Sequence, residues 1–213
     1  MGRAQPTKNN MRAGSELRKL VLVACTGLVL LTCGVDGKKK QSVPKLRSDG
    51  DMAFAKGDMK KAKKLFSKVI KLEPKNERNY YKRFRVYLKE RAYAEALQDL
   101  TTALEVEPKY KQGLYQRGKL QMQMGHCVEA EADLKTLLKI DPQNKKALQD
   151  APAAAQCAQS IRNAEAHVQS GNHRGAHEHY TSALTHTTSS HKLHLERGKV
   201  CFAMGEWERA DSK

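Results

Sequence analysis

Cysteines are few in this 213-residue sequence, and the five present are unevenly placed. Cys25 and Cys33 lie in an apolar N-terminal run, which leaves Cys127, Cys157 and Cys201 in the body of the chain. An odd, widely spaced set without a C-x-x-C pair excludes both a disulfide-stapled scaffold and a zinc ribbon. We therefore interpret the last three as small buried thiols, and a single Cys127–Cys157 bridge is the less favoured alternative.

Aromatic residues and catalytic motifs are also scarce. Aromatics make up 6% of the chain, and abundant Lys, Ala, Leu and Gln favour an all-α class. The sequence contains no H-E-x-x-H, no Walker loop, no G-x-G-x-x-G and no G-x-S-x-G, so we expect no enzymatic activity and no cofactor. His173 and His177 would share one helix face and could bind a metal together. We interpret them as solvated and expect no metal.

Acidic residues are outnumbered, because 39 Lys and Arg stand against 23 Asp and Glu, a formal net charge of +16. A strongly basic chain can bind nucleic acid, anionic membranes or acidic proteins. Much of the excess lies in the N-terminal region, and the rest is spread over expected helices and turns, so we interpret it as a solvated surface. No recognition motif accompanies the charge, and we expect no nucleic-acid partner.

One long apolar run stands near the N-terminus. Residues 20–35 read LVLVACTGLVLLTCGV without a charge, after a basic stretch and before Lys38–Lys40. The run is shorter than the ~20 apolar residues that cross a bilayer comfortably. We therefore predict a cleaved signal peptide over residues 1–37 and a basic linker over 38–42. An uncleaved signal anchor is the alternative, and it would be the chain's one contact with a membrane.

A 34-residue repeat is the strongest signal in the sequence. Prolines, alanines and large apolar residues recur in register, in columns that include Pro74, Pro108, Pro142, Ala62, Ala96, Ala130, Phe66, Leu100 and Leu134. Each repeat is predicted to form two amphipathic helices joined by a tight turn, over about 44–56 and 60–72 in repeat one. A glycine at position 57 suits the turn, and small alanines allow the two helices to approach closely.

Beyond Pro142 the spacing changes from 34 to 46 residues, which indicates an insertion of twelve. We place the insertion in a lengthened first helix of repeat four that starts near Pro152. A fifth repeat is predicted from His191, and its second helix would be incomplete at Lys213, which suggests a fragment. The predicted organisation is repeats 1–3 over 43–150, then the lengthened helix, repeat 4 and incomplete repeat 5 over 151–213.

These columns resemble the tetratricopeptide-repeat (TPR) family over about residues 43–213. Gly50 and Gly118 occupy a small-residue column of that family, and Tyr87 occupies an aromatic one. Three positions depart from the family pattern, namely Phe84, Ala53 and Gln121. The resemblance implies an all-α solenoid of tandem 34-residue helix-turn-helix repeats that forms a right-handed superhelix, and a protein-interaction function without catalysis.

A narrower resemblance is to the kinase-inhibiting, DnaJ-like co-chaperones of the endoplasmic reticulum, whose TPR array follows a signal peptide. It rests on the order of signal, three regular repeats and a longer helix, and on the segments GDMKKAKKLFSKVIKLEP and MGHCVEAEADLKTLLKIDP. It implies residence in the endoplasmic-reticulum lumen or secretory pathway, and unfolded client proteins or a lumenal heat-shock chaperone system as partners. No His-Pro-Asp tripeptide occurs, so stimulation of a partner ATPase is not implied.

In a TPR superhelix the first helix of each repeat faces the concave side, so residues recurring there would line a groove. The predicted peptide-binding residues are Arg47, Asp51, Tyr81, Arg85, Tyr115, Lys119 and Met122. Tyrosines and methionine edged by cations suit an extended, partly acidic polypeptide. The alternative is a scaffold that binds one folded partner or an acidic tail. The carboxylate clamp of some TPR domains is absent, because Asp51, Gln112 and Gln116 occupy its positions.

Overall fold

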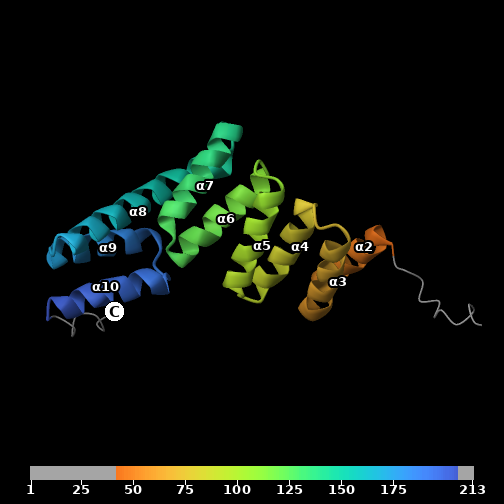
Figure 1. The fold of residues 1–213 in the computed structure, drawn as a ribbon, viewed down its shortest axis with the longest axis horizontal. Coiled ribbons are helices and arrows are strands. Elements are labelled where there is room, and N and C mark those ends of the chain that lie inside the picture. Colours follow the sequence, from red (N-terminus) through yellow and green to blue (C-terminus); the bar gives the residue numbers. More distant parts are fainter. Residues whose placement is uncertain (1–41, 206–213) are drawn as a thin grey trace, which may run out of the picture. The chain divides into compact units, whose positions relative to one another are not determined.

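The computed structural model describes residues 42–205, and these residues form nine helices and no strand. The helices are α2 (Val43–Ala55), α3 (Met59–Leu72), α4 (Glu77–Lys89), α5 (Tyr93–Val106), α6 (Lys111–Met124), α7 (Cys127–Ile140), α8 (Lys145–Gln169), α9 (His173–His186) and α10 (His191–Ala203). Each helix packs against the next one along the chain (Figure 1). The predicted signal and linker, and the second helix of repeat five, lie outside the described residues.

The helix pairs form because the repeated columns meet in the core. Ala62, Ala96 and Ala130 have no exposed surface, as the close approach of two helices requires. In the first repeat a Cβ at Gly50 would lie 2.7 Å from the ring of Phe66, so this helix crossing depends on a missing side chain. The predicted helices 44–56 and 60–72 are observed as α2 and α3, shifted by about one residue.

The turns within the helix pairs follow one pattern. Gly57 adopts a left-handed φ of 81°, and the side chain of Asp58 then caps α3 by accepting a hydrogen bond from the Lys61 amide at 2.9 Å. Gly125 and Gly171 take the same conformation in later pairs. A residue without a Cβ adopts this backbone readily.

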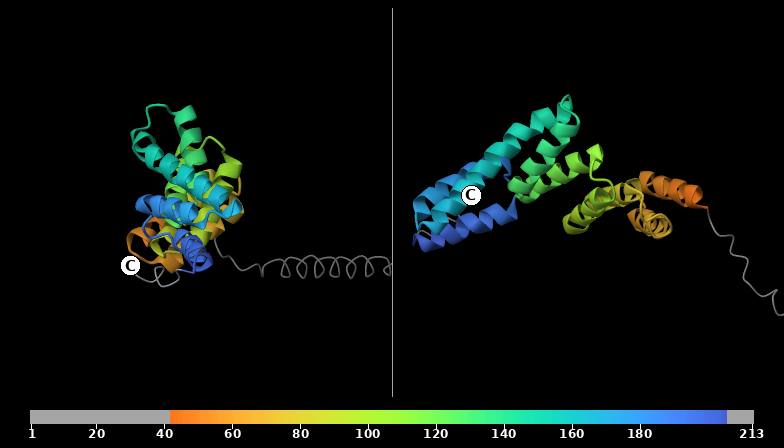
Figure 2. Two further views of the ribbon diagram at one scale, coloured as in Figure 1. Left: turned by 90° about the vertical axis from the view of Figure 1, so that its left-hand side faces the viewer. Right: turned by 45° about the horizontal axis from the view of Figure 1, so that its top comes forward.

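Helix α8 begins at Lys145 and not near Pro152, so the predicted start was wrong. Asn144 caps the helix through a hydrogen bond from the Ala147 amide at 3.2 Å. Pro152 lies exposed inside the helix. The carbonyl that loses its helical partner there belongs to Leu148, which is itself 49% exposed, so water can replace the missing donor. The first half of α8 lies beside α7 and the second half beside α9 (Figure 2).

A disulfide joins Cys127, at the start of α7, to Cys157, in the middle of α8. The favoured interpretation of these two residues as free thiols was therefore wrong, and the bridge treated as the alternative is present. The sequence offered this pair only as the less favoured alternative, because the contact between the two cysteines depends on how α7 and α8 pack. Cys201 is a free and buried thiol, as predicted.

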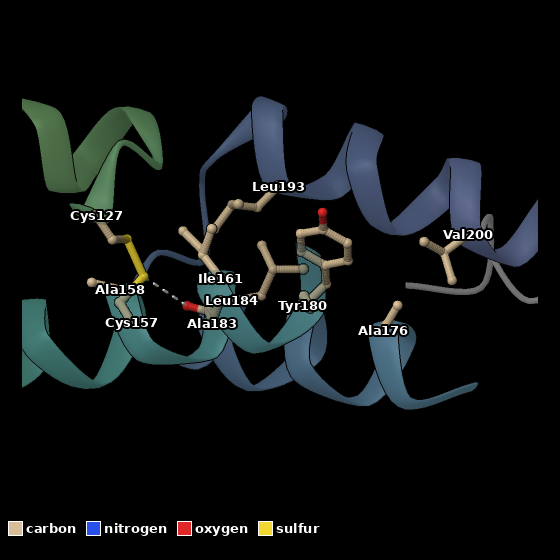
Figure 3. Close-up of a cluster of buried hydrophobic side chains, with 11 residues drawn as sticks. Cys127, Cys157, Ala158, Ile161, Ala176, Tyr180, Ala183, Leu184, Leu193 and Val200 are labelled. Atoms are coloured by element: carbon tan, nitrogen blue, oxygen red, sulfur yellow. Dashed lines mark hydrogen bonds between the residues drawn. A yellow bond between two sulfur atoms is a disulfide. The ribbon is translucent and has the colours of Figure 1, made fainter. Parts of the chain in front are cut away.

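The disulfide lies within a hydrophobic cluster built from α7, α8, α9 and α10 (Figure 3). Ile161, Tyr180, Leu184 and Leu193 belong to the same cluster, and both bridged cysteines have no exposed surface. Four helices therefore share one core at this end of the array. None of the described helices is long and apolar enough to span a bilayer.

Glu131 on α7 connects this helix to α8 through an ion pair with Arg162. We expect this contact to make the stability of the fold depend on pH. Burial raises the pKa of Glu131, but hydrogen bonds from Lys135 and Arg162 outweigh burial and lower the pKa overall. Because the folded pKa lies below the unfolded one, the stabilisation is present above about pH 4.5 and is lost as the pH falls through the folded value. We expect Glu131→Gln to lower the urea midpoint at pH 7 and to approach the midpoint of the unsubstituted protein as the pH falls through the folded pKa. A midpoint difference that persists at low pH would contradict this account.

Candidate functional site

Two adjoining hollows are formed by the first helices of successive repeats, α4, α6 and α8. The first, of about 450 Å³, is lined by Tyr81, Lys111, Gln112, Tyr115, Gln116, Asp141, Gln143, Asn144, Lys145 and Lys146. The second, of about 610 Å³, is lined by Arg78, Tyr81, Lys82, Arg85, Glu107, Lys109, Tyr110, Lys111 and Gln112. Tyr81, Lys111 and Gln112 belong to both. We call the combined lining the α4–α8 groove.

Aromatic side chains form the floor of this groove. Tyr81 meets Tyr110 edge to face with ring centroids 5.8 Å apart, and it also packs on Phe84. The Tyr115 hydroxyl donates a hydrogen bond to Oδ2 of Asp150 at 2.9 Å. Burial, together with this hydrogen bond, raises the pKa of Tyr115 to about 12, so the phenol stays neutral at physiological pH. Rigid, half-buried tyrosines of this kind contribute strongly to protein interfaces.

Positive charge surrounds the aromatic floor. Seven of the groove's side chains are Lys or Arg and two are acidic. Lys111 pairs with Asp141 at 3.2 Å, whereas Lys109, Lys145 and Lys146 are exposed. The guanidinium of Arg85 lies 4.5 Å from the centroid of the Phe54 ring, which holds it in place by a cation–π contact. The groove therefore favours an occupant that carries acidic groups.

The seven predicted groove residues have different surroundings. Tyr81, Arg85 and Tyr115 line the groove. Asp51 accepts a 2.6 Å hydrogen bond from Lys82 of α4. Met122 packs into the hydrophobic core.

Arg47 and Lys119 complete the set. Arg47 binds Glu73 at 2.6 Å and Oδ1 of the buried Asn79 at 3.3 Å, so its guanidinium joins the first two repeats. Lys119 is exposed and forms no ion pair among residues 42–205. The structure thus brings three of the seven into one groove, and the binding role of the whole set stays a prediction.

Sequence reasoning missed the lysines at the helix starts. Lys111 and Lys145 occupy one column at the 34-residue spacing, and Arg78 and Lys146 occupy the next column, with Gln112 between them. The predicted stripes began several residues later in each first helix. Extending the column comparison to the first turn of each helix would have found these cations.

The histidines gather around α9. The rings of His167 and His179 stack with centroids 5.2 Å apart, and His173 is half-buried at the start of α9. Within the described part of the chain, no group of three His, Cys, Asp or Glu side chains is arranged to hold a metal ion.

Two family models, both described as tetratricopeptide repeat, match residues 50–76 and 87–157. These ranges include α3, α5, α6 and α7 and parts of α2, α4 and α8, whereas the groove residues of α4 lie between them. The chain forms a tetratricopeptide-repeat solenoid. The TPR fold is a non-enzymatic scaffold for protein interactions, and it positions first helices side by side so that their exposed faces make a continuous surface.

Solved structures give the same fold. The crystal structure of the P58(IPK) TPR domain has a TM-score of 0.67 at 25% identity, with coverage of 79% of this chain and 48% of its own. A TPR protein from Parabacteroides merdae has a TM-score of 0.53 at 19% identity, with coverage of 94% and 73%. The first TPR of Spaghetti (RPAP3), solved bound to an HSP90 peptide, has a TM-score of 0.50 at 22% identity, with coverage of 58% and 96%.

The chain thus spans about half the length of the P58(IPK) TPR domain. At 19% and 22% identity the other two likenesses show the fold alone. No curated protein matches the chain.

Proposed function

We propose that this TPR protein is a co-chaperone-type module that binds unfolded or extended client polypeptide in the α4–α8 groove. The groove itself carries the proposal, because it combines half-buried tyrosines with an excess of exposed cations. Side chains of a client could pack on Tyr81 and Tyr115 while its acidic groups meet the lysines. The likeness to the P58(IPK) TPR domain, at 25% identity, supports a protein-interaction module of the TPR kind.

We further propose that the protein resides in the endoplasmic-reticulum lumen or elsewhere in the secretory pathway. The predicted signal over residues 1–37 supports this proposal. The Cys127–Cys157 disulfide supports it independently, since structural disulfides persist in oxidising compartments. A lumenal heat-shock chaperone system is then the expected partner, and the N-terminal segment, if uncleaved, the expected membrane contact.

Client binding predicts that the full-length chain, in several-fold molar excess, suppresses aggregation of a chemically denatured reporter protein. The variant Lys109→Gln/Lys146→Gln removes one exposed cation from each hollow and disrupts no ion pair among the described residues. Each ion pair made by an exposed lysine is worth up to about 1 kcal/mol, so loss of both should lower the affinity for an extended acidic peptide by about tenfold. Fluorescence anisotropy with a labelled peptide measures this loss.

The matched control is Lys64→Gln/Lys68→Gln, which removes two exposed charges from α3, outside the groove. Equal weakening by both variants would indicate unspecific attraction to a basic chain and would contradict groove binding. If the chain left reporter aggregation unchanged but bound a native protein with an acidic tail, the favoured function would become an assembly scaffold. The cationic excess of the groove is the observation that keeps this second function open.

A further inference from the structure

A separate pocket forms on the chain where three turns meet. It has a volume of about 610 Å³ and is lined by Arg91, Tyr93, Gln123, Met124, His126, Ser189, His191 and Lys192. These residues come from the α4–α5, α6–α7 and α9–α10 connections, and none of them lines the α4–α8 groove. We call this site the turn pocket.

The inserted length of α8 is what closes the turn pocket, because it returns α10 to the α6–α7 turn (Figure 1). The Ser190 hydroxyl donates a hydrogen bond to the carbonyl of Met124 at 3.0 Å, across 66 residues of sequence. A Cβ at Gly125 would lie 2.0 Å from that hydroxyl. Glycine is therefore required at this turn for two reasons. A side chain would collide with Ser190, and the backbone has a φ of 82°.

The lining of the turn pocket is basic. Arg91 and Lys192 are exposed cations, and the rings of His126 and His191 supply nitrogen atoms that can form hydrogen bonds. No lining residue is acidic. The carboxylate of Glu129 lies 3.6 Å from Nδ1 of His126, and the Glu129 side chain is 54% exposed.

Polar groups without charge complete the lining. The hydroxyls of Tyr93 and Ser189 and the amide of Gln123 can each donate a hydrogen bond, and Gln123 already contacts the Tyr93 hydroxyl at 3.3 Å. Such a lining has donors for several anionic oxygens at once.

Arg91 adopts a left-handed backbone conformation that glycine adopts at the equivalent position of the other repeats. Its φ is +57°, whereas Gly57, Gly125, Gly171 and Gly205 take φ values of 71–82° in the same turn. A residue with a Cβ adopts this region at a steric cost. Backbone strain of this kind is often found at functional sites. The side chain of Arg91 lines the pocket, so a role in binding would explain why arginine replaces glycine here.

We propose that the turn pocket binds a phosphate monoester. A guanidinium can pair two oxygens of a phosphate dianion, and lysine, imidazole N–H and hydroxyl groups can bind the others. The pocket is larger than a bare phosphate, so the group would arrive attached to a larger body. That body is either a phosphorylated side chain of a protein or a small phosphorylated compound.

The test is a titration of the full-length, isotope-labelled chain, followed by its amide NMR signals. The probes are inorganic phosphate, a short peptide with a central phosphoserine, and the same peptide with serine. We expect phosphate to shift the signals of residues 91, 126 and 192 in a saturable way. A phosphopeptide that binds at least about tenfold more tightly than phosphate identifies a protein-borne group, and equal binding identifies a small compound.

Arg91→Gly is the decisive variant, because it relieves the backbone and removes the charge together. We expect phosphate affinity to fall by about tenfold or more while the urea midpoint stays the same or rises. A variant that misfolded would lose phosphate affinity and would also have a lower urea midpoint. Lys68→Gln, which removes an exposed charge from α3, should leave affinity within about twofold. Shifts that spread over all lysines without saturating, or an Arg91→Gly variant with unchanged affinity, would overturn the proposal.

Discussion

Reduction of the Cys127–Cys157 disulfide is expected to lower the free energy of unfolding by about 3.5 kcal/mol. The bridge closes a loop across 30 residues, and a cross-link of that span removes conformational freedom from the unfolded chain. In a chain of this size the thermal midpoint should fall by roughly 10 °C. Urea unfolding followed by far-ultraviolet circular dichroism, with and without a reducing agent, measures the effect.

The native fold should survive the reduction. Both cysteines are fully buried between Ile161, Leu184 and Leu193, and two reduced thiols fit such a site as small apolar groups. The helical signal of the reduced protein at low urea should therefore remain close to that of the oxidised protein. Cys127→Ala/Cys157→Ala should reproduce the reduced midpoint, apart from a further loss due to the missing sulfur atoms.

A control separates the bridge from the remaining thiol. Cys201→Ala removes the buried free cysteine and should retain the full response to the reducing agent. Coincident unfolding curves in oxidising and reducing buffer would show that the bridge does not stabilise the protein. That result would also weaken the disulfide as support for the proposed secretory location, which would then rest on the predicted signal.

The helical repeat could be predicted from sequence because it depends on local and periodic signals. The alanine column at 62, 96 and 130 and the glycine turns recur at fixed spacing, so one repeat length identifies the buried face and the turn of each helix pair. The same reasoning failed at Pro152, where proline usually marks a helix start. Here the helix begins seven residues earlier, at Lys145, and Asn144 caps it. Exposure lets water satisfy the carbonyl that proline leaves unpaired.

Long-range contacts explain the other misses. The disulfide depends on how the lengthened α8 lies against α7, and the turn pocket depends on the contact of the α9–α10 turn with the α6–α7 turn. No 34-residue column describes either contact. The groove was predicted in part, because Tyr81, Arg85 and Tyr115 recur on first helices. Arg47 could not be assigned in advance, since its partner Glu73 lies in a turn that no first-helix stripe includes.

A second repeated feature, a buried ion pair, was not visible as a column because the first repeat lacks it. Arg83 binds Asp99 through two hydrogen bonds of 2.9 and 2.6 Å. Arg117 and Asp133 form the same pair 34 residues later, at 2.7 Å each. Repeat one carries Asp49 and Leu65 in these positions, so two repeats contain the pair and one does not.

Removing one partner of the Arg83–Asp99 pair should be the most destabilising charge substitution in the chain. Asp99 has a side chain only 4% exposed, and Arg83→Met would leave it without its charge partner. Breaking a buried pair from one side costs about 3 to 5 kcal/mol. The double variant Arg83→Met/Asp99→Leu removes both charges and should recover most of that loss, since apolar groups of similar size can replace a buried pair. Urea unfolding of the two variants measures the difference.

The loss caused by Arg83→Met should also depend on pH, in a direction that the burial of Asp99 determines. Burial raises the pKa of Asp99, and the hydrogen bonds from Arg83 act against that rise. Without the arginine the folded pKa rises further above its unfolded value, so the folded variant binds a proton more readily than the unfolded chain. Its stability relative to the unsubstituted protein should therefore be best below about pH 4 and should decline as the pH rises through the folded pKa. A loss of equal size at pH 4 and pH 8 would mean that packing, and not the unpaired carboxylate, accounts for the cost.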